Sequence, residues 1–372
     1  MTPTAFIGAR VFDGERITEP ATVVITGGVI TADSSTEGAD IVDAAGATLL
    51  PGLIDTHTHP RTPDQLVKAA RAGITTLIDL GSPSLANLAA LRSEKDAPDI
   101  KSAGHVASAP GSMFIEALGM PTSTGVAGPG DAARFVAERA AEGSDVIKII
   151  IEDPRFPGAK PLDTDTVAAL VEAAHEVGYL TVAHIVSTST LRSALEAGVD
   201  VVTHTTLSSE IDDETRELIA QRGTVIIPTL GMMDGIVKAV GGSLRMRIIG
   251  ALVPAARIRY RYAEATVRAF RDAGSVVLAG TDANDYPEVP YQPPFGESLH
   301  EELAKLVAAG LPPIEVLQGA TSHAADVFGM NDRGRILAGH RADLALVDGD
   351  PTSDISVSRR VRGVWIGGRR IA

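Results

Sequence analysis

The chain has 372 residues, of which 44% are hydrophobic and 22% charged, the composition of a globular enzyme rather than of a disordered or fibrous chain. Its formal net charge of −14, without any basic stripe, argues against a nucleic-acid partner. Cysteine is absent, so disulfides and thiolate metal ligands are excluded, and any metal site must use histidine, carboxylate or a modified lysine.

The N-terminal segment carries no sign of export or membrane insertion. Residues 1–4 (Met-Thr-Pro-Thr) lack the basic region and apolar stretch of a secretory signal, and no apolar segment is long enough to span a bilayer. We therefore expect a cytoplasmic protein without a membrane partner. The residues that follow predict short strands over 5–12, 22–26 and 39–43, separated by glycine-containing turns.

From Leu53 onward, short β-rich runs alternate with amphipathic segments. After the run that begins at Leu53, strands are expected over 73–80, 100–105, 145–151, 180–184, 199–204, 224–228 and 275–281. Eight strand–helix units predict an α/β fold, a closed (β/α)8 TIM barrel. The last forty residues again show the pattern of short β-strands, and we expect both chain ends to meet in a small β-sandwich. The predicted domains are thus 51–334 for the barrel, and 1–50 with 335–372 for the sandwich.

Three long connections, 106–130, 230–250 and 283–296, each follow the carboxyl end of a predicted strand. Barrels of this kind carry their active sites at that face. Long loops there commonly act as lids or substrate walls, and we expect the same role here.

A histidine pair, His57 and His59, ends the apolar run 49–59. Residues two apart on a strand point to the same face, so both imidazoles project together from one strand end. Two converging neutral imidazoles suit a divalent transition metal, whereas two exposed loop histidines are the alternative.

Lys148 lies within 145–151 (Asp-Val-Ile-Lys-Ile-Ile-Ile), a run expected to be buried on both faces. An ammonium there needs a partner or loses its proton. Two interpretations are equally open from this strand: a lysine paired with a carboxylate inside the barrel, or a lysine carboxylated by carbon dioxide that bridges two metals.

Three further polar residues end their own apolar runs. His184 and His204 close successive predicted strands, and Asp282 follows the eighth. Each has a structural alternative, a hydrogen-bonded core histidine or a helix N-cap. Two strand-end histidines together with His57 and His59 favour a metal site instead.

These residues, with the segments 51–59 (Pro-Gly-Leu-Ile-Asp-Thr-His-Thr-His) and 334–344 (Gly-Arg-Ile-Leu-Ala-Gly-His-Arg-Ala-Asp-Leu), resemble the amidohydrolase superfamily. The closest resemblance is to its imidazolonepropionase-like and metal-dependent prolidase-like branch, and it covers nearly the whole chain. The resemblance implies a binuclear site, usually zinc. His57, His59 and Asp282 would hold one ion, His184 and His204 the other, and N6-carboxylated Lys148 would bridge them.

The resemblance further implies a hydrolase that cleaves the amide bond of a dipeptide, an N-acyl amino acid or a related small molecule. A metal-bridging hydroxide would attack, with Asp282 as general base and then general acid. Hydrolysis of a lactone or a phosphoester is an alternative function, because the same metal pair can catalyse it. A mononuclear deaminase is the alternative, but residues 185–188 (Ile-Val-Ser-Thr) lack the glutamate that such enzymes place after the fifth-strand histidine. A non-catalytic scaffold is least favoured because all six ligands are present.

Six residues are candidates for substrate contact, each with a structural alternative: His105 as a core histidine, Arg61 and Arg155 as exposed loop arginines, and the others as lid packing. The arginines could bind a substrate carboxylate, and the others could line its pocket. The set is His105, Arg61, Arg155, Tyr286, Tyr291 and Met232. The metal identity, the substrate and the formation of a homo-oligomer remain open.

Overall fold

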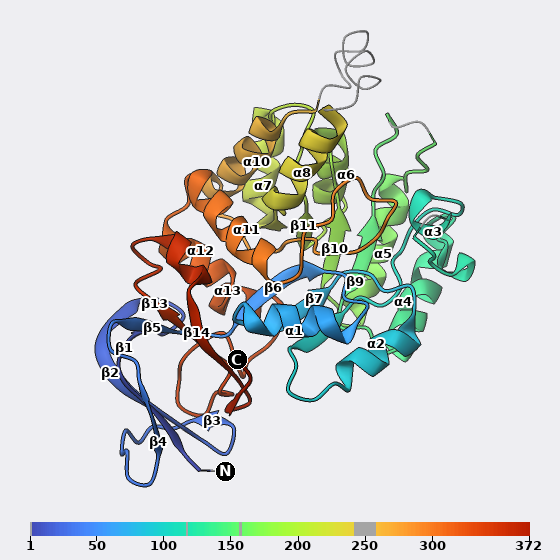
Figure 1. Cartoon of the computed structure of the whole chain (residues 1–372). Coiled ribbons are helices and arrows are strands. Elements are labelled where there is room, and N and C mark those ends of the chain that lie inside the picture. The colour runs from blue at the N-terminus through green and yellow to red at the C-terminus, as the bar shows by residue number, and fades with distance from the viewer. Residues whose placement is uncertain (1, 117, 156–157, 242–257) are drawn as a thin grey trace.

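A computed structural model of the chain describes residues 2–116, 118–155, 158–241 and 258–372 (Figure 1). From the first histidine-bearing strand onward, short parallel strands alternate with helices, as the sequence predicts. The strands are β6 (Leu53–Thr58), β7 (Ile74–Asp79), β8 (Asp99–Ser102), β9 (Ile147–Ile150), β10 (Thr181–His184), β11 (Val201–Thr203) and β12 (Val225–Ile227).

These strands form two parallel sheets, one in the order β6-β7-β8 and the other in the order β12-β11-β10-β9. Single parallel bridges lie between the sheets. Ala107 bridges Ile149 after β8, while Val277 and Ala283 bridge Ile226 and Thr58 respectively. The segment 277–283 therefore lies between β12 and β6.

One apolar cluster joins these strands. Each strand, or the residue adjoining it, contributes a buried side chain, as in the filled interior of a TIM barrel. The contributors are Ile54, Ile78, Ala103, Val146, Val182, Val201, Ile227 and Leu278. The fold is therefore α/β and TIM-barrel-like, and it brings the carboxyl ends of the strands to one face.

The predicted eighth strand over 275–281 forms no regular ladder, which corrects the sequence expectation. The Leu278 amide donates to the Ile226 carbonyl oxygen of β12 at 2.8 Å, and the Ala279 carbonyl oxygen accepts from the Thr56 amide of β6 at 3.1 Å. The segment is therefore bonded to its two neighbouring strands through different residues. A Cβ at Gly280 would lie 2.8 Å from the Thr56 hydroxyl. The close backbone approach at this glycine accounts for the interrupted pattern.

Helices surround these strands (Figure 1). They are α1 (Pro63–Arg71), α2 (Leu85–Arg92), α4 (Ala132–Ala141), α5 (Thr164–Glu176), α6 (Thr188–Glu196), α7 (Asp213–Arg222), α8 (Leu230–Gly241), α10 (Tyr260–Asp272), α11 (Glu297–Ala308), α12 (Pro313–Gly319) and α13 (Ser322–Val327). Local sequence sets several of their ends. The Asp212 side chain accepts from the Thr215 amide at the start of α7, and Gly223 ends that helix in the left-handed conformation.

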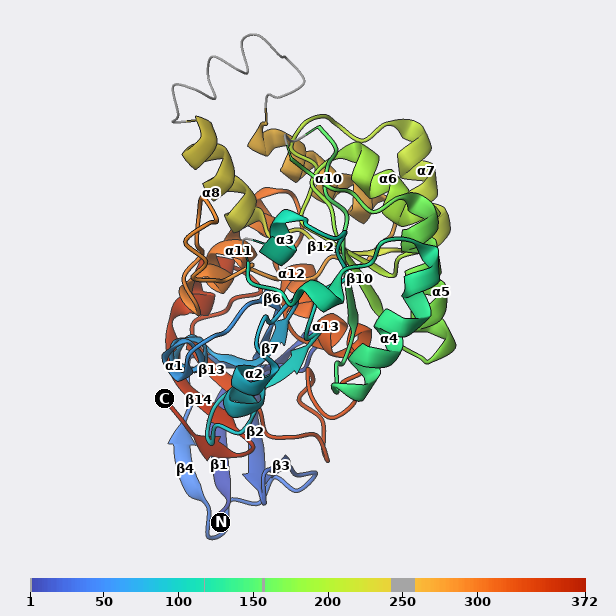
Figure 2. The same cartoon turned by 90° about the vertical axis from the view of Figure 1, so that its right-hand side faces the viewer.

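Both chain ends contribute to one mixed sheet of eight strands beside the parallel strands (Figure 2). Its strands are β1 (Thr4–Phe12), β2 (Ile17–Thr26), β3 (Val29–Ile30), β4 (Asp40–Asp43), β5 (Ala47–Pro51), β13 (Leu344–Asp348), β14 (Val361–Ile366) and β15 (Arg369–Arg370). β5 pairs antiparallel with β13, which joins the two ends of the chain. Phe6 and Trp365 pack edge to face, with ring centroids 4.7 Å apart, inside a separate apolar cluster.

The three long connections differ from one another. Residues 106–130 include the short helix α3 (Met113–Glu116), and 283–296 contain no helix or strand. The expected loop 230–250 is wrong at its start, because residues 230–241 form α8; its remainder lies outside the described residues. No helix in the described ranges has both the length and the apolar character needed to cross a bilayer.

His300 of α11 connects the helical layer to the C-terminal segment. Its Nδ1 lies 2.9 Å from the Ser358 hydroxyl of the short helix η4 (Ile355–Arg359), and its Nε2 lies 2.9 Å from the Ala72 carbonyl oxygen. Burial lowers the pKa of His300 from 6.5 to about 4. The folded protein therefore holds this imidazole neutral.

This burial predicts a specific loss of stability in mild acid. As the pH falls from 6.5 toward 4, the unfolded chain takes up a proton at His300 that the folded chain refuses, so the free energy of unfolding decreases. Between about pH 7.5 and pH 5, the free energy of unfolding of the His300→Gln variant should therefore decrease by about 2 kcal/mol less than that of wild type. Urea unfolding at the two pH values measures this difference; equal decreases in both proteins would contradict it.

Candidate metal centre

The structure brings His57, His59 and Asp282 together at one end of the parallel strands. The Nε2 atoms of the two histidines are 3.3 Å apart, and Asp282 Oδ1 lies 3.5 Å from the first and 3.1 Å from the second. Ligand atoms roughly 2.1 Å from one ion at tetrahedral angles lie about 3.4 Å from each other. The three atoms are thus spaced as the ligands of a single divalent ion are.

Two further imidazoles adjoin this group. The rings of His57 and His204 have centroids 5.0 Å apart, and those of His204 and His184 are 4.6 Å apart. Burial, followed by the charge of Lys148, lowers the pKa of His184 to about 3. Burial also places the pKa values of His57 and His204 well below their usual value. All three imidazoles are therefore neutral at pH 7, the form that binds a metal.

The Lys148 side chain is buried, and its Nζ has no hydrogen-bond partner among the described residues. Burial lowers the pKa of its amine from 10.5 to about 7, although the nearby charge of Asp282 acts in the opposite direction. The described residues place no carboxylate within hydrogen-bond distance of Lys148 Nζ. The structure therefore does not support the lysine–carboxylate pair, the first of the two interpretations that the sequence left open.

His59 has carboxylates on both sides. Its Nδ1 lies 3.0 Å from the Gly81 carbonyl oxygen and 3.7 Å from Asp79. Burial alone would lower the pKa of His59, but hydrogen bonds to Asp282 and Asp79 raise it to about 10. A metal ion at Nε2 would displace the proton on that atom, while Nδ1–H continues to donate to the Gly81 carbonyl oxygen.

Several residues that hold the ligands in place were missed by the sequence analysis. Asp55 accepts from the Thr281 amide at 3.0 Å and from its hydroxyl at 2.7 Å, which ties β6 to the segment that carries Asp282. Burial raises the pKa of Asp55 to about 7. The Thr203 hydroxyl lies 2.5 Å from His57 Nδ1. Their common signal is a polar residue in or beside a strand that carries a ligand.

The backbone at the site is strained. Four non-glycine residues in the described ranges have positive φ, and three of them are His204 (72°), Thr229 (48°) and Asp282 (58°). Such conformations are uncommon outside glycine and cluster at functional sites. The packing around the site must therefore hold these residues in place.

Of the six candidate substrate contacts, Tyr286 and Arg61 lie beside the metal ligands. Tyr286 is buried, and its ring centroid is 5.8 Å from that of His59. The Arg61 guanidinium lies over the Tyr286 ring at 5.1 Å, and its loose pairing with Asp285 at 3.6 Å leaves it half-exposed.

The other four candidates have their contacts elsewhere. His105 lies 3.4 Å from Glu142, just after α4, and Arg155 pairs with Asp153. Tyr291 packs onto α8 at Gly235, and Met232 is part of the main apolar core. Their predicted substrate contacts therefore gain no support from the structure. Tertiary packing of the loops, which periodicity does not reveal, determines these placements.

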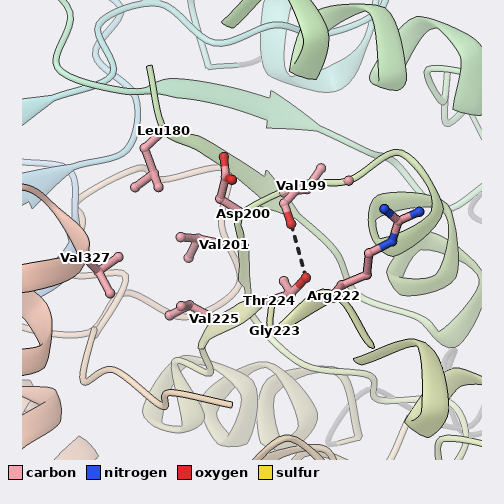
Figure 3. Close-up of a pocket in the computed structure, with 10 residues that line it drawn as sticks. Leu180, Val199, Asp200, Val201, Arg222, Gly223, Thr224, Val225 and Val327 are labelled. Atoms are coloured by element: carbon pink, nitrogen blue, oxygen red, sulfur yellow. Dashed lines mark hydrogen bonds between the residues drawn. The ribbon is translucent and has the colours of Figure 1, made fainter. Parts of the chain in front are cut away.

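A cavity of about 330 Å³ lies at the opposite ends of the strands (Figure 3). It is lined by Leu180, Val201 and Val225, which are at or near the amino ends of β10, β11 and β12, and by Val327. The metal-ligand histidines lie at the carboxyl ends of their strands. This cavity is therefore separate from the candidate metal centre.

An apolar wall borders the centre. The Phe114 ring packs edge-on against His184, with centroids 5.3 Å apart. A Cβ at Gly81 would lie 2.9 Å from Val106, 3.5 Å from Met120 and 3.6 Å from His59. Val106 and Met120 belong to one buried cluster against which Phe114 packs. The wall thus extends from the neighbourhood of His59 to His184.

Comparison with known proteins agrees with this architecture. The model of the amidohydrolase family matches residues 48–371. An uncharacterized protein of Mycobacterium bovis is 30% identical over 302 residues, covering 76% of this chain and 75% of that protein. Imidazolonepropionase of Deinococcus deserti is 31% identical over 126 residues, which cover 33% of this chain and 30% of that enzyme.

Solved structures show the same fold. The crystal structure of a Xaa-Pro dipeptidase with methionine bound in its active site superposes with a TM-score of 0.83, covering 99% of each chain at 23% identity. At this identity the likeness shows the α/β, TIM-barrel-like fold.

Proposed function

The chain belongs to the amidohydrolase family and is a hydrolase of carbon–nitrogen bonds, and on that premise we propose a binuclear metal-dependent enzyme that cleaves an amide bond. The substrate is a dipeptide, an N-acyl amino acid or a related small molecule. The observation that carries the proposal is the grouping of four imidazoles, three of them neutral, with one carboxylate and a buried lysine that has no hydrogen-bond partner among the described residues.

His57, His59 and Asp282 would hold one ion, and His184 and His204 the other. The first three offer ligand atoms within 4.8 Å of one another, and the donor set of nitrogen and oxygen suits zinc. When bound, the two ions supply an activated water and a Lewis acid for the scissile carbonyl.

Lys148 would bridge the ions as N6-carboxylysine. Its buried, unpartnered amine favours the neutral form, which is the nucleophile for carbon dioxide. Formation of the nitrogen–carbon bond converts the amine into an anionic carbamate and releases one proton. The product replaces an isolated buried nitrogen by two oxygen donors.

Asp282 is the proposed general base and acid. Its Oδ1 lies 3.5 Å from His57 Nε2 and 3.1 Å from His59 Nε2, and its side chain is nearly buried. From this position it accepts a proton from the attacking water and delivers it to the leaving amine. The Asn284 side-chain amide donates to the Asp282 carbonyl oxygen at 2.7 Å and Asp55 holds Thr281, so Asp282 and the residue before it are anchored.

The surroundings support a substrate with one apolar group and one carboxylate. The wall formed by Phe114, Val106 and Met120 offers an apolar surface beside the ligands. The half-exposed Arg61 over Tyr286 offers a planar cation that can pair with a carboxylate. Acylated amino acids and dipeptides combine both features.

The domain organisation remains a proposal of its own. We propose that residues 51–334 form a closed (β/α)8 barrel and that 1–50 and 335–372 form a small β-sandwich. The bridges at Ala107, Val277 and Ala283 support closure. The separate apolar cluster around Phe6 and Trp365 supports an independent terminal unit.

The test of function is a substrate panel on protein reconstituted with Zn²⁺ in bicarbonate. N-acyl amino acids and dipeptides with an apolar residue should be hydrolysed with kcat/KM of about 10⁴ M⁻¹ s⁻¹ or more. Ammonia release from aminated heterocycles, without hydrolysis of any amide, would contradict the proposal. Turnover of lactones or phosphoesters alone would move the enzyme to another bond class.

A matched arginine pair tests recognition of the carboxylate within the same panel. Arg61→Met should raise KM for carboxylate-bearing amides about 10-fold or more and leave amides without a carboxylate unchanged. Arg155→Met removes the same charge from a residue already paired with Asp153 and should change neither. Equal effects of the two variants would argue against the assigned role of Arg61.

A further inference from the structure

We propose that Glu302, a buried carboxylate on α11, is a positioning residue that acts on His204 through the start of α8 and Thr229. Glu302 is not one of the proposed metal ligands and takes no part in the proposed reaction. The inference rests on the proposed function only in naming His204 as a ligand, because the geometry that carries it is independent of activity.

The first link is the contact between Glu302 and α8. Its two carboxylate oxygens accept one hydrogen bond each, from the Leu230 amide at 2.8 Å and from the Gly231 amide at 2.7 Å. These are the first two amides of α8, and amides at a helix start have no partner within their helix. The Glu302 side chain is fully buried, and α8 and α11 pack side by side (Figure 2).

The second link is Thr229, the residue just before α8. Its carbonyl oxygen accepts from the Met233 amide at 3.0 Å, so Thr229 occupies the N-cap position. A threonine there ordinarily turns its hydroxyl toward the first turn of its own helix. Here the hydroxyl lies 2.8 Å from His204 Nδ1, and Glu302 supplies the acceptors for the helix amides instead.

The third link is the imidazole of His204. When Nδ1–H donates to the Thr229 hydroxyl, the ring adopts the tautomer with a free Nε2, the form required for metal binding through that atom. Both His204 and Thr229 have positive φ, an uncommon conformation that surrounding contacts must maintain. The Glu302 contacts anchor the backbone directly after Thr229.

Removal of the carboxylate should therefore release the Thr229 hydroxyl from His204. The helix amides then lack an acceptor, and the Thr229 hydroxyl can supply one by taking the usual N-cap arrangement. His204 loses its orienting partner, and the expected result is a 10- to 100-fold weaker affinity for the ion held by His184 and His204.

Three variants and a control separate this role from general packing. Glu302→Gln replaces one of the two accepting oxygens by an NH2 group that cannot accept. Thr229→Val removes the hydroxyl while keeping the shape, and Thr229→Ser keeps the hydroxyl. The control is Asp234→Asn, which weakens a different α8–α11 contact, the 2.7 Å ion pair with Lys305. Glu302→Gln and Thr229→Val should weaken Zn²⁺ affinity similarly, whereas Thr229→Ser and Asp234→Asn should retain it.

The metal measurement is competition between the protein and a chromophoric chelator for Zn²⁺. The double variant Glu302→Gln/Thr229→Val should be no weaker than the weaker single variant, because both substitutions interrupt the same path. Independent, multiplicative losses in the double variant would overturn the inference. Wild-type affinity in Glu302→Gln would overturn it as well.

The imidazole ¹⁵N spectrum of the metal-free protein provides a readout that needs neither metal nor substrate. His204, assigned by its loss in His204→Gln, should show the Nδ1–H tautomer in wild type and a mixture of tautomers in Glu302→Gln. An unchanged His204 spectrum would reject the positioning role even if the enzyme proved inactive. If Glu302→Gln shifts the His204 tautomer as expected but the wild-type protein does not bind two ions, the positioning role would stand and the proposed function would be rejected.

Discussion

Replacing Asp282 by asparagine is expected to lower kcat by about 10³-fold or more, with little change in KM. The variant keeps the size of the side chain but removes both a metal ligand and the only proposed proton carrier. Asparagine also tolerates the positive φ of 58° at this position, so the backbone can remain as it is. Steady-state kinetics on the preferred acyl amino acid measures the effect.

Asp285→Asn is the matched control. This carboxylate is three residues away and half-exposed, and it pairs loosely with Arg61 rather than with the histidines. The same loss of charge there should leave kcat within about twofold of wild type. A value of kcat within tenfold of wild type in Asp282→Asn would remove Asp282 from the proton transfer.

Lys148→Met is expected to reduce kcat/KM by about 10³-fold or more while leaving the protein as stable as wild type or more stable. The two results have one cause. The buried amine has no hydrogen-bond partner among the described residues, so its removal relieves an unfavourable burial, and it also removes the proposed bridge between the ions. Kinetics and thermal unfolding of the same preparation measure both.

The control for this variant is Lys101→Met on β8. Lys101 pairs with Asp145 at 3.3 Å and is partly exposed, so its loss should leave activity unchanged and lower stability slightly. A Lys148→Met variant that is strongly destabilised but active would indicate a structural lysine instead.

The alternation of strands and helices could be predicted from the sequence because most of the strands are short apolar runs buried on both faces, with β8 as the exception. The α2 bounds, Leu85–Arg92, and seven of the eight expected parallel strands appear in the structure. The eighth, over 275–281, could not be predicted correctly. Its backbone is shared between two neighbours, and the close contact at Gly280 depends on the position of Thr56, more than two hundred residues away in sequence.

The ligand candidates could be predicted for a simple reason: each ends an apolar run, except Lys148, which lies inside one, and parallel strands bring their carboxyl ends to one face. The residues that orient the ligands could not. Thr229 and Glu302 are ordinary in their local sequence, and their roles arise from the packing of α8 against α11. His105 also ends a predicted strand, yet its contact is with Glu142 after α4.

The most direct test of the account is the metal content of the wild-type chain, measured by elemental analysis after purification in bicarbonate without chelator. The account predicts a value close to two divalent ions per chain, falling to one or fewer in Lys148→Met. A value close to one that does not change in Lys148→Met would contradict the bridged binuclear centre.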